Sequence, residues 1–201
     1  RDADIVGFSL YVWNARLSLA IAAVLKERHP DIFIVCGGPH VPDHAEGFLR
    51  DNPAVNLVIH GEGERRFKDV LENLKTCTWH NCDGVSFLTD DGAFHHNPPG
   101  PRIRDLDEIP SPYSTGLFNE LMKSVSEEEW LVLWETNRGC PFACTFCDWG
   151  SATQSKVFQF GEDRLEQELA WISKKKIEST DLFNSNKLIN EWNNLQKQHP
   201  A

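Results

Sequence analysis

The sequence predicts an α/β protein whose N-terminal part is a doubly wound, largely parallel sheet. Short apolar, β-branched runs alternate with segments of helical periodicity, and glycine-rich turns follow the apolar runs. Strands that alternate with helices at such short spacing pair in parallel through right-handed crossovers. Near residue 130, another strand-like run precedes three closely spaced cysteines and marks a second segment of different character.

The first expected strand covers residues 5–12, which are short, apolar and β-branched. Asn14 can cap the helix that follows, and His29 with Pro30 ends that helix. The core face of the helix is expected at the apolar positions with helical spacing, which are Leu17, Ile21, Val24 and Leu25.

Two further strands are expected at residues 32–36 and 56–60, and each runs into a glycine-rich turn. The second turn opens another helix. Its core face is expected to carry Phe67, Val70, Leu71 and Leu74.

The glycine-rich turns are candidate binding segments, because ligands of doubly wound sheets bind beyond the C-terminal ends of the strands. Glycine lets the backbone approach a ligand closely, and a helix N-terminus favours an anion. Strand-to-helix turns also need glycine for local reasons, so that alternative stays open. Neither a G-x-G-x-x-G nor a P-loop motif is present, which removes support for dinucleotide or P-loop binding. The turn residues are Ser9, Leu10, Gly37, Gly38, Pro39, Gly61, Glu62 and Gly63.

After the third strand and its helix, residues 85–87 and 93–94 flank Asp90-Asp91-Gly92, which predicts a hairpin. His95 and His96 are adjacent on the second arm, so they point to opposite faces and are not expected to share a metal. Five prolines between residues 98 and 112 then indicate an extended linker.

Cys140, Cys144 and Cys147 form a C-x3-C-x2-C motif. Three thiolates on one short loop can hold three corners of a 4Fe-4S cluster and leave the fourth iron open. The alternative is a zinc site with His80 or Cys82 as a distant fourth ligand. Cys36, Cys77 and Cys82 lack metal-ligand spacing and are expected to be buried or idle thiols.

Composition limits the function classes. The 201 residues are 40% hydrophobic and 25% charged, a typical globular balance, with a formal net charge of −10 at pH 7. An acidic chain is a poor bulk partner for nucleic acid or an anionic membrane. No secretory signal or membrane span is visible, and clustered cysteines indicate a reducing compartment, so we expect a cytoplasmic protein.

The cysteine loop resembles that of the radical S-adenosylmethionine (SAM) enzymes, whose signature is C-x3-C-x2-C. Phe146 stands where that family often places an aromatic residue beside the adenine of SAM. The run at residues 130–136 looks like the first strand of the family's partial (β/α) barrel, which carries chemistry at the C-terminal ends of its strands. The resemblance implies a 4Fe-4S cluster that cleaves SAM with an electron from a reductant such as flavodoxin or ferredoxin.

The first three strands resemble the third, fourth and fifth strands of the Rossmann-like cobalamin-binding domain that precedes the barrel in many radical SAM enzymes. By that resemblance the eight turn residues named above would line the nucleotide tail of cobalamin. One departure is that the D-x-H-x-x-G motif, whose histidine ligates cobalt in many such domains, is absent from this sequence.

Three segments follow from these arguments: a partial cobalamin-binding domain at 1–78, a hairpin and proline-rich linker at 79–128, and a truncated radical SAM domain at 129–201. Residues 162–175 are expected to form a helix with Leu165, Leu169 and Ile172 on its core face. The second barrel strand that should follow is not recognisable at residues 179–186. Because the chain starts at Arg1 and holds little of a barrel, it is expected to be a fragment.

The expected activity is radical SAM chemistry, with methyl transfer to an unactivated carbon of a small molecule as the leading interpretation. No catalytic residue is assigned besides the cofactor-binding ones. Because most of a barrel is missing, the alternatives are a non-catalytic cobalamin-binding module and a zinc-stabilised interaction module.

Overall fold

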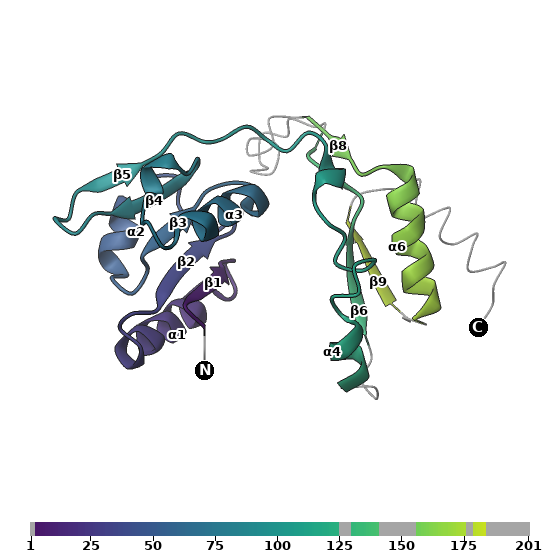
Figure 1. Ribbon diagram of the computed structural model, residues 1–201, viewed down its shortest axis with the longest axis horizontal. Coiled ribbons are helices and arrows are strands. Elements are labelled where there is room, and N and C mark those ends of the chain that lie inside the picture. The colour runs from purple at the N-terminus through teal and green to yellow at the C-terminus, as the bar shows by residue number, and fades with distance from the viewer. Residues whose placement is uncertain (1–2, 125–129, 141–155, 176–178, 184–201) are drawn as a thin grey trace. The chain divides into compact units, whose positions relative to one another are not determined.

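The structure, a computed structural model, describes residues 3–124, 130–140, 156–175 and 179–183. The chain divides into two compact units, Arg1–Arg102 and Ile103–Ala201, each with its own core (Figure 1). The boundary differs from the three expected segments, because the hairpin is built into the sheet of the first unit.

The first unit is a five-stranded sheet in the order β1-β2-β3-β4-β5 (Figure 1). Its strands are β1 (Ile5–Ser9), β2 (Phe33–Gly37), β3 (Leu57–Ile59), β4 (Val85–Leu88) and β5 (Phe94–His96). The first three are parallel, as the alternation of strands and helices predicted, and β4 and β5 add to β3 as an antiparallel hairpin. The expected doubly wound α/β architecture is therefore confirmed.

Helices cover both faces of this sheet. They are α1 (Ala15–Arg28), α2 (Glu46–Asp51) and α3 (Gly63–Asn73), with a 3-10 turn η1 (Trp79–Asn81). The core on one face joins α1 and α2 to Cys36 and Val58, whereas the core on the other face joins α3 to Val35 and Leu57. Alternate residues of β2 and β3 thus point into separate cores, as a strand buried on both faces requires.

The expected core face of α1 is wrong. Leu17, Ile21 and Val24 are exposed, Leu17 by 66% of its surface, and of the predicted set Leu25 alone packs against the core. The buried positions of the helix are Ala15 and Ala22. Two alanines let the helix backbone approach the sheet closely, so the helix turns its small side chains inward.

Asn14 stands at the predicted N-cap position of α1 but makes no capping hydrogen bond. Its Oδ1 accepts from the Tyr11 N–H at 2.8 Å, and its Nδ2 donates to the Ser9 carbonyl at 3.0 Å. The side chain therefore braces the turn between β1 and α1. In α3 the prediction holds for Phe67, Val70 and Leu74, which pack in the core, but Leu71 is exposed.

The second unit begins with η2 (Leu106–Glu108) and α4 (Asn119–Ser124). It continues with β6 (Leu131–Glu135), β7 (Asn137–Arg138), β8 (Phe158–Gln159), α6 (Glu162–Lys174) and β9 (Ser179–Phe183). Strand β6 pairs in parallel with β9, and β7 pairs antiparallel with β8. The predicted core face of α6 is confirmed, because Leu165 and Ile172 are buried and Leu169 packs against them.

The absence of a strand at residues 179–186 was a wrong expectation. Residues Ser179–Phe183 pair with Leu131–Glu135 over five positions, which completes a β-α-β unit with α6 as the connection. The polar start of this segment hides it from a hydrophobicity argument, and its strand conformation comes from backbone pairing with β6. Among the helices that the structure describes, none combines the length and apolar character that crossing a membrane requires.

Candidate functional site

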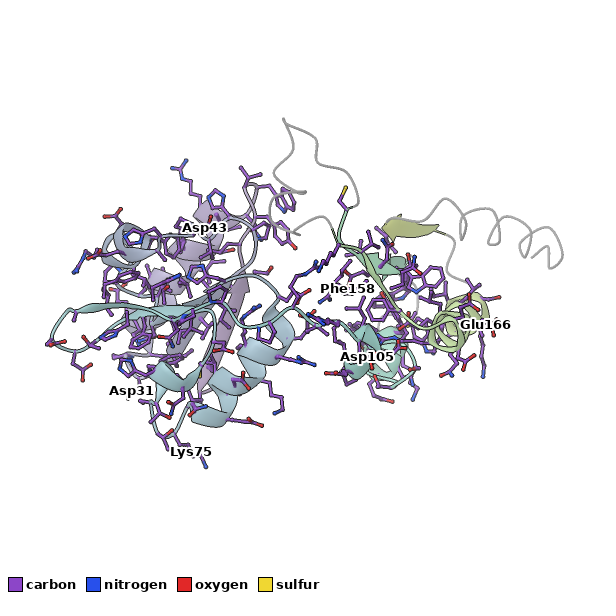
Figure 2. All side chains as sticks on the ribbon, turned by 90° about the horizontal axis from the view of Figure 1, so that it is seen from above. Asp31, Asp43, Lys75, Asp105, Phe158 and Glu166 are labelled. Atoms are coloured by element: carbon purple, nitrogen blue, oxygen red, sulfur yellow. The ribbon has the colours of Figure 1, made fainter. Side chains whose placement is uncertain are left out.

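The C-terminal ends of β1, β2 and β3 meet at one edge of the first sheet. Ser9 lies beside Gly37 in the strand register, the Leu10 N–H donates to the Gly37 carbonyl at 2.7 Å, and the His40 N–H donates to the Leu10 carbonyl at 3.0 Å. Figure 2 places Asp43, which follows β2, at the end of the first unit opposite to Asp31, which precedes β2. The structure thus brings the first two groups of predicted turn residues together.

Gly38 is required by this packing. Its φ is +94°, and a Cβ there would lie 2.7 Å from the Leu10 carbonyl oxygen and 2.9 Å from the Leu10 nitrogen. The Leu10 side chain is fully buried in the core. Leu10 therefore shapes the edge through its backbone, while Ser9 and Pro39 are exposed beside it.

The third predicted group, Gly61-Glu62-Gly63, joins β3 to α3 and is held by a buried arginine. Arg66 donates to the carbonyl oxygens of Glu62 and of Gly100, the latter at 3.0 Å, and Arg66 itself is buried. Within the described part of the chain, Arg66 Nε has no hydrogen-bond partner. No sequence pattern singled out this arginine, because its partner Gly100 lies 34 residues away.

Two glycines make room for that guanidinium. Gly84 has a φ of +61°, and a Cβ there would lie 2.6 Å from Arg66 Nε, while a Cβ at Gly61 would lie 3.2 Å from Nη1. Gly63, in contrast, has open space beside it, because a Cβ there would meet no described atom within 4 Å. The first turn of α3 is therefore open at this position, and the role of Gly63 in binding stays a prediction.

Beside this edge, three polar side chains form a hydrogen-bonded chain that the sequence did not predict. Ser86 Oγ lies 2.8 Å from His60 Nε2 and 2.8 Å from His96 Nδ1. Burial, followed by the nearby His96, lowers the pKa of His60 from its usual 6.5. The three residues come from β4, the end of β3 and β5, so only the pairing of these strands brings them together.

In the second unit, Cys140 follows β6 and β7 and is half-buried with a free thiol. Cys144, Cys147 and Phe146 lie outside the described residues. Strands β7 and β8 pair Asn137 with Gln159, so the residues on either side of the cysteine segment are held together.

Gly139, directly before Cys140, is fixed by its surroundings. Its φ is +110°, and a Cβ there would overlap the carbonyl oxygen of Lys156. Arg138 makes a two-pronged pair with the Glu135 carboxylate, at 2.9 Å from Nε and 2.9 Å from Nη2. The start of the cysteine segment is therefore built from a glycine-dependent close contact and a charge-assisted clamp.

A second buried group supports the strand that leads to Cys140. Glu168 of α6 is 2% exposed and accepts hydrogen bonds from Trp134 Nε1 at 2.8 Å and from Arg164 Nε at 3.1 Å. The sequence could have indicated that Glu168 is buried, since helical spacing places position 168 on the same face of the helix as Leu165 and Ile172. A carboxylate in a core stripe needs buried partners.

The residues proposed for a fourth zinc ligand lie in the first unit. Burial raises the pKa of the Cys82 thiol, and it raises that of Cys36, which was not a candidate ligand, to about 12. His80 packs its ring against His95 and Phe87. Across the described ranges, no cluster of three or more His, Cys, Asp or Glu residues can hold a metal.

Residues 1–71 match the family model described as B12 binding domain. The chain is 40% identical over 186 residues to the 2-(S-pantetheinyl)-carbapenam-3-carboxylate methyltransferase of Streptantibioticus cattleyicolor. It is 38% identical over 186 residues to the cobalamin-dependent radical SAM methyltransferase TokK of Streptomyces tokunonensis. Each alignment covers 90% of this chain and 27% of the relative, so the chain spans about a quarter of the length of either protein.

A solved structure shows the same fold. It is the cobalamin-dependent S-adenosylmethionine radical enzyme OxsB with aqua-cobalamin and S-adenosylmethionine bound, which matches with a TM-score of 0.68 at 22% sequence identity. The match covers 89% of this chain and 25% of that structure.

Proposed function

Because this chain belongs to the radical SAM enzymes that carry a cobalamin-binding domain, we propose that it is part of a cobalamin-dependent radical SAM methyltransferase. The reaction would be reductive cleavage of SAM at a 4Fe-4S cluster, followed by methyl transfer to an unactivated carbon of a small molecule. The methyltransferase names of both relatives support the choice of reaction.

Cys140, Cys144 and Cys147 would hold the cluster as thiolates. When bound, the cluster would supply the electron that cleaves SAM. The chain's own contribution is position: Gly139 lets the backbone turn into the cysteine segment, and the pair of Glu135 with Arg138 holds the residues before it. Phe146 would lie against the adenine.

The edge formed by β1, β2 and β3 would hold the nucleotide tail of cobalamin. When bound, cobalamin supplies the methyl group. The exposed Ser9 and Pro39 and the open backbone at Gly63 are the parts of the chain that fit a ligand, while Leu10, Gly37 and Gly38 form the floor. Gly61 and Glu62 would contribute through the loop that Arg66 holds in place.

One observation carries this proposal most directly. Cys140 follows the C-terminal end of β6, the first strand of a parallel β-α-β unit, and a glycine-dependent contact holds the backbone beside it.

Anaerobic reconstitution with iron and sulfide, followed by electron paramagnetic resonance of the reduced protein, tests the cluster. We expect a reduced-cluster signal that changes when SAM is added. Equal iron and sulfide content would exclude the zinc alternative directly. A signal indifferent to SAM, together with no formation of 5′-deoxyadenosine, would overturn the radical SAM proposal for this chain.

A second candidate function is a cobalamin-binding module without catalysis. It is favoured by the match of residues 1–71 to the B12 binding domain model and by the five-stranded sheet that these residues help to build. Titration with cobalamin, followed by visible absorption, separates the candidates when combined with the resonance experiment. Cobalamin binding without a SAM-responsive cluster would support the module.

The partners follow from the chemistry. We propose a small-molecule substrate and an external electron donor such as flavodoxin or ferredoxin. The net charge of −10 argues against nucleic acid or an anionic membrane surface as a bulk partner.

A further inference from the structure

The chain of His60, Ser86 and His96 connects the surface to the candidate cofactor edge. His96 on β5 is exposed, Ser86 on β4 is fully buried, and the half-buried His60 directly precedes Gly61. Both contacts to Ser86 Oγ are 2.8 Å long, which is within strong hydrogen-bonding distance.

Counting hydrogens leaves two ways to place the protons along the hydrogen bonds that join His60, Ser86 and His96. The Ser86 hydroxyl has one hydrogen, and within the described residues its hydrogen-bonding partners are the two imidazoles. If His60 donates from Nε2, Ser86 donates to His96 Nδ1 and His60 Nδ1 is a bare acceptor. If His96 donates from Nδ1, Ser86 donates to His60 Nε2, and the proton of neutral His60 sits on Nδ1.

Protonation of His96 selects the second arrangement. A charged imidazole carries hydrogens on both nitrogens, so His96 Nδ1 must then donate to Ser86. Ser86 can then only donate to His60, because an unpaired buried hydroxyl hydrogen is costly. His60 Nδ1 is thereby fixed as a donor without His60 gaining a charge.

The surroundings keep His60 neutral while this happens. Burial and the charge of His96 both lower the pKa of His60, and Arg66 of α3 acts in the same direction. Asp43, in the segment between β2 and α2, opposes them and favours the charged ring, but its effect is smaller than those of burial and of His96.

We propose that Ser86 and His96 are positioning residues that set the tautomer of His60, and that His60 makes ligand binding at the edge of β1, β2 and β3 dependent on pH. The identity of the ligand as cobalamin rests on the proposed function, whereas the tautomer coupling does not. The nucleotide tail of cobalamin carries phosphate and amide oxygens, which are acceptors. Because His60 directly precedes Gly61 of the proposed edge, a donor at its Nδ1 would bind such an acceptor more tightly than a bare nitrogen would.

The test is nitrogen-detected nuclear magnetic resonance of the histidine rings between pH 8 and 5.5, in the protein without ligand. We expect the proton of His60 to move from Nε2 to Nδ1 as His96 titrates. His96→Gln and Ser86→Ala should each abolish this dependence on pH. His95→Gln is the matched control, because His95 is the adjacent residue on β5 and stacks on Phe87 at the opposite face.

Cobalamin titration at the same pH values provides the second measurement. In the wild type and in His95→Gln, cobalamin affinity should rise by about fivefold at the lower pH, which is the effect of about one net hydrogen bond. In His96→Gln the affinity should stay constant. A His60 tautomer that ignores the titration of His96 would overturn the coupling. A tautomer that switches while affinity stays constant would overturn the role of His60 in binding, and absence of cobalamin binding at every pH would count against the proposed function alone.

Discussion

At the residue scale, single glycines and buried polar groups define both candidate sites. Gly38 and Gly139 each occupy the left-handed region of backbone space, and each lies against a backbone segment that a Cβ would strike. At both candidate sites, backbone geometry therefore constrains the choice of residue.

Replacing Gly139 with alanine should disrupt the cysteine segment. The positive φ alone costs about 1–2 kcal/mol for a residue with a Cβ, and the overlap with Lys156 forces the backbone to move. We expect iron incorporation after anaerobic reconstitution to fall by more than half. Gly92→Ala is the control, since Gly92 also has a positive φ but open space around it, and it should keep full iron content.

The lowered pKa of His60 makes stability depend on pH. The unfolded chain takes up a proton near pH 6.5, whereas folded His60 resists it until a lower pH, so the free energy of unfolding should fall as the pH drops below about 6.5. One proton contributes at most about 1.4 kcal/mol per pH unit, and less for this half-buried ring.

Urea unfolding at pH 7.5 and 5.5 measures this effect. His60→Gln keeps a polar group near Ser86 but cannot titrate, so its loss of stability on acidification should be smaller than that of the wild type. An identical loss in both proteins would show that other groups cause the pH dependence.

At the element scale, the sequence predicted most of the strands and helix faces that show a local hydrophobic pattern. It missed the features that depend on pairing with strands distant in sequence. Strands β1 to β3, the hairpin and the core face of α6 followed from local patterns. The inward face of α1 did not, because the tight fit of Ala15 and Ala22 outweighs the larger residues on the other side. Strand β9 and the chain through Ser86 depend on neighbours that are distant in sequence, so no local pattern reveals them.

Substitution of Glu168 tests whether a buried carboxylate stabilises the packing of α6. Glu168→Ala would leave the Arg164 guanidinium and the Trp134 indole without their buried acceptor, which should lower the free energy of unfolding by about 3–5 kcal/mol. Glu166→Ala, at an exposed position of the same helix (Figure 2), should change it by less than about 0.5 kcal/mol. Equal effects in urea unfolding would contradict the structural role of the buried carboxylate.

At the scale of the whole molecule, the chain is two units with separate cores. Each unit carries one of the two candidate sites, the sheet edge in the first and the cysteine segment in the second. Turn glycines and cysteine spacing predict both candidate sites from the sequence, and both assignments stay predictions. The division at residue 102 was not visible, because the pairing of β4 with β3 draws the hairpin into the first unit.

Separate cores predict separate unfolding transitions in differential scanning calorimetry. Leu57→Ala removes a fully buried side chain from the first core and Ile172→Ala removes one from the second, and each should cost about 2–5 kcal/mol. Each substitution should lower the temperature of one transition and leave the other unchanged. A single transition shifted by both would mean that the units unfold together.

The arginine beneath the glycine-rich loop has a consequence for how the protein is made. Arg66 binds the carbonyl oxygens of Glu62 and Gly100, and Gly100 stands at the very end of the first unit. During synthesis the loop therefore lacks the anchor at Gly100 until the ribosome has released the chain as far as the linker. The edge that we propose for cobalamin therefore acquires its final form only when its own unit is complete.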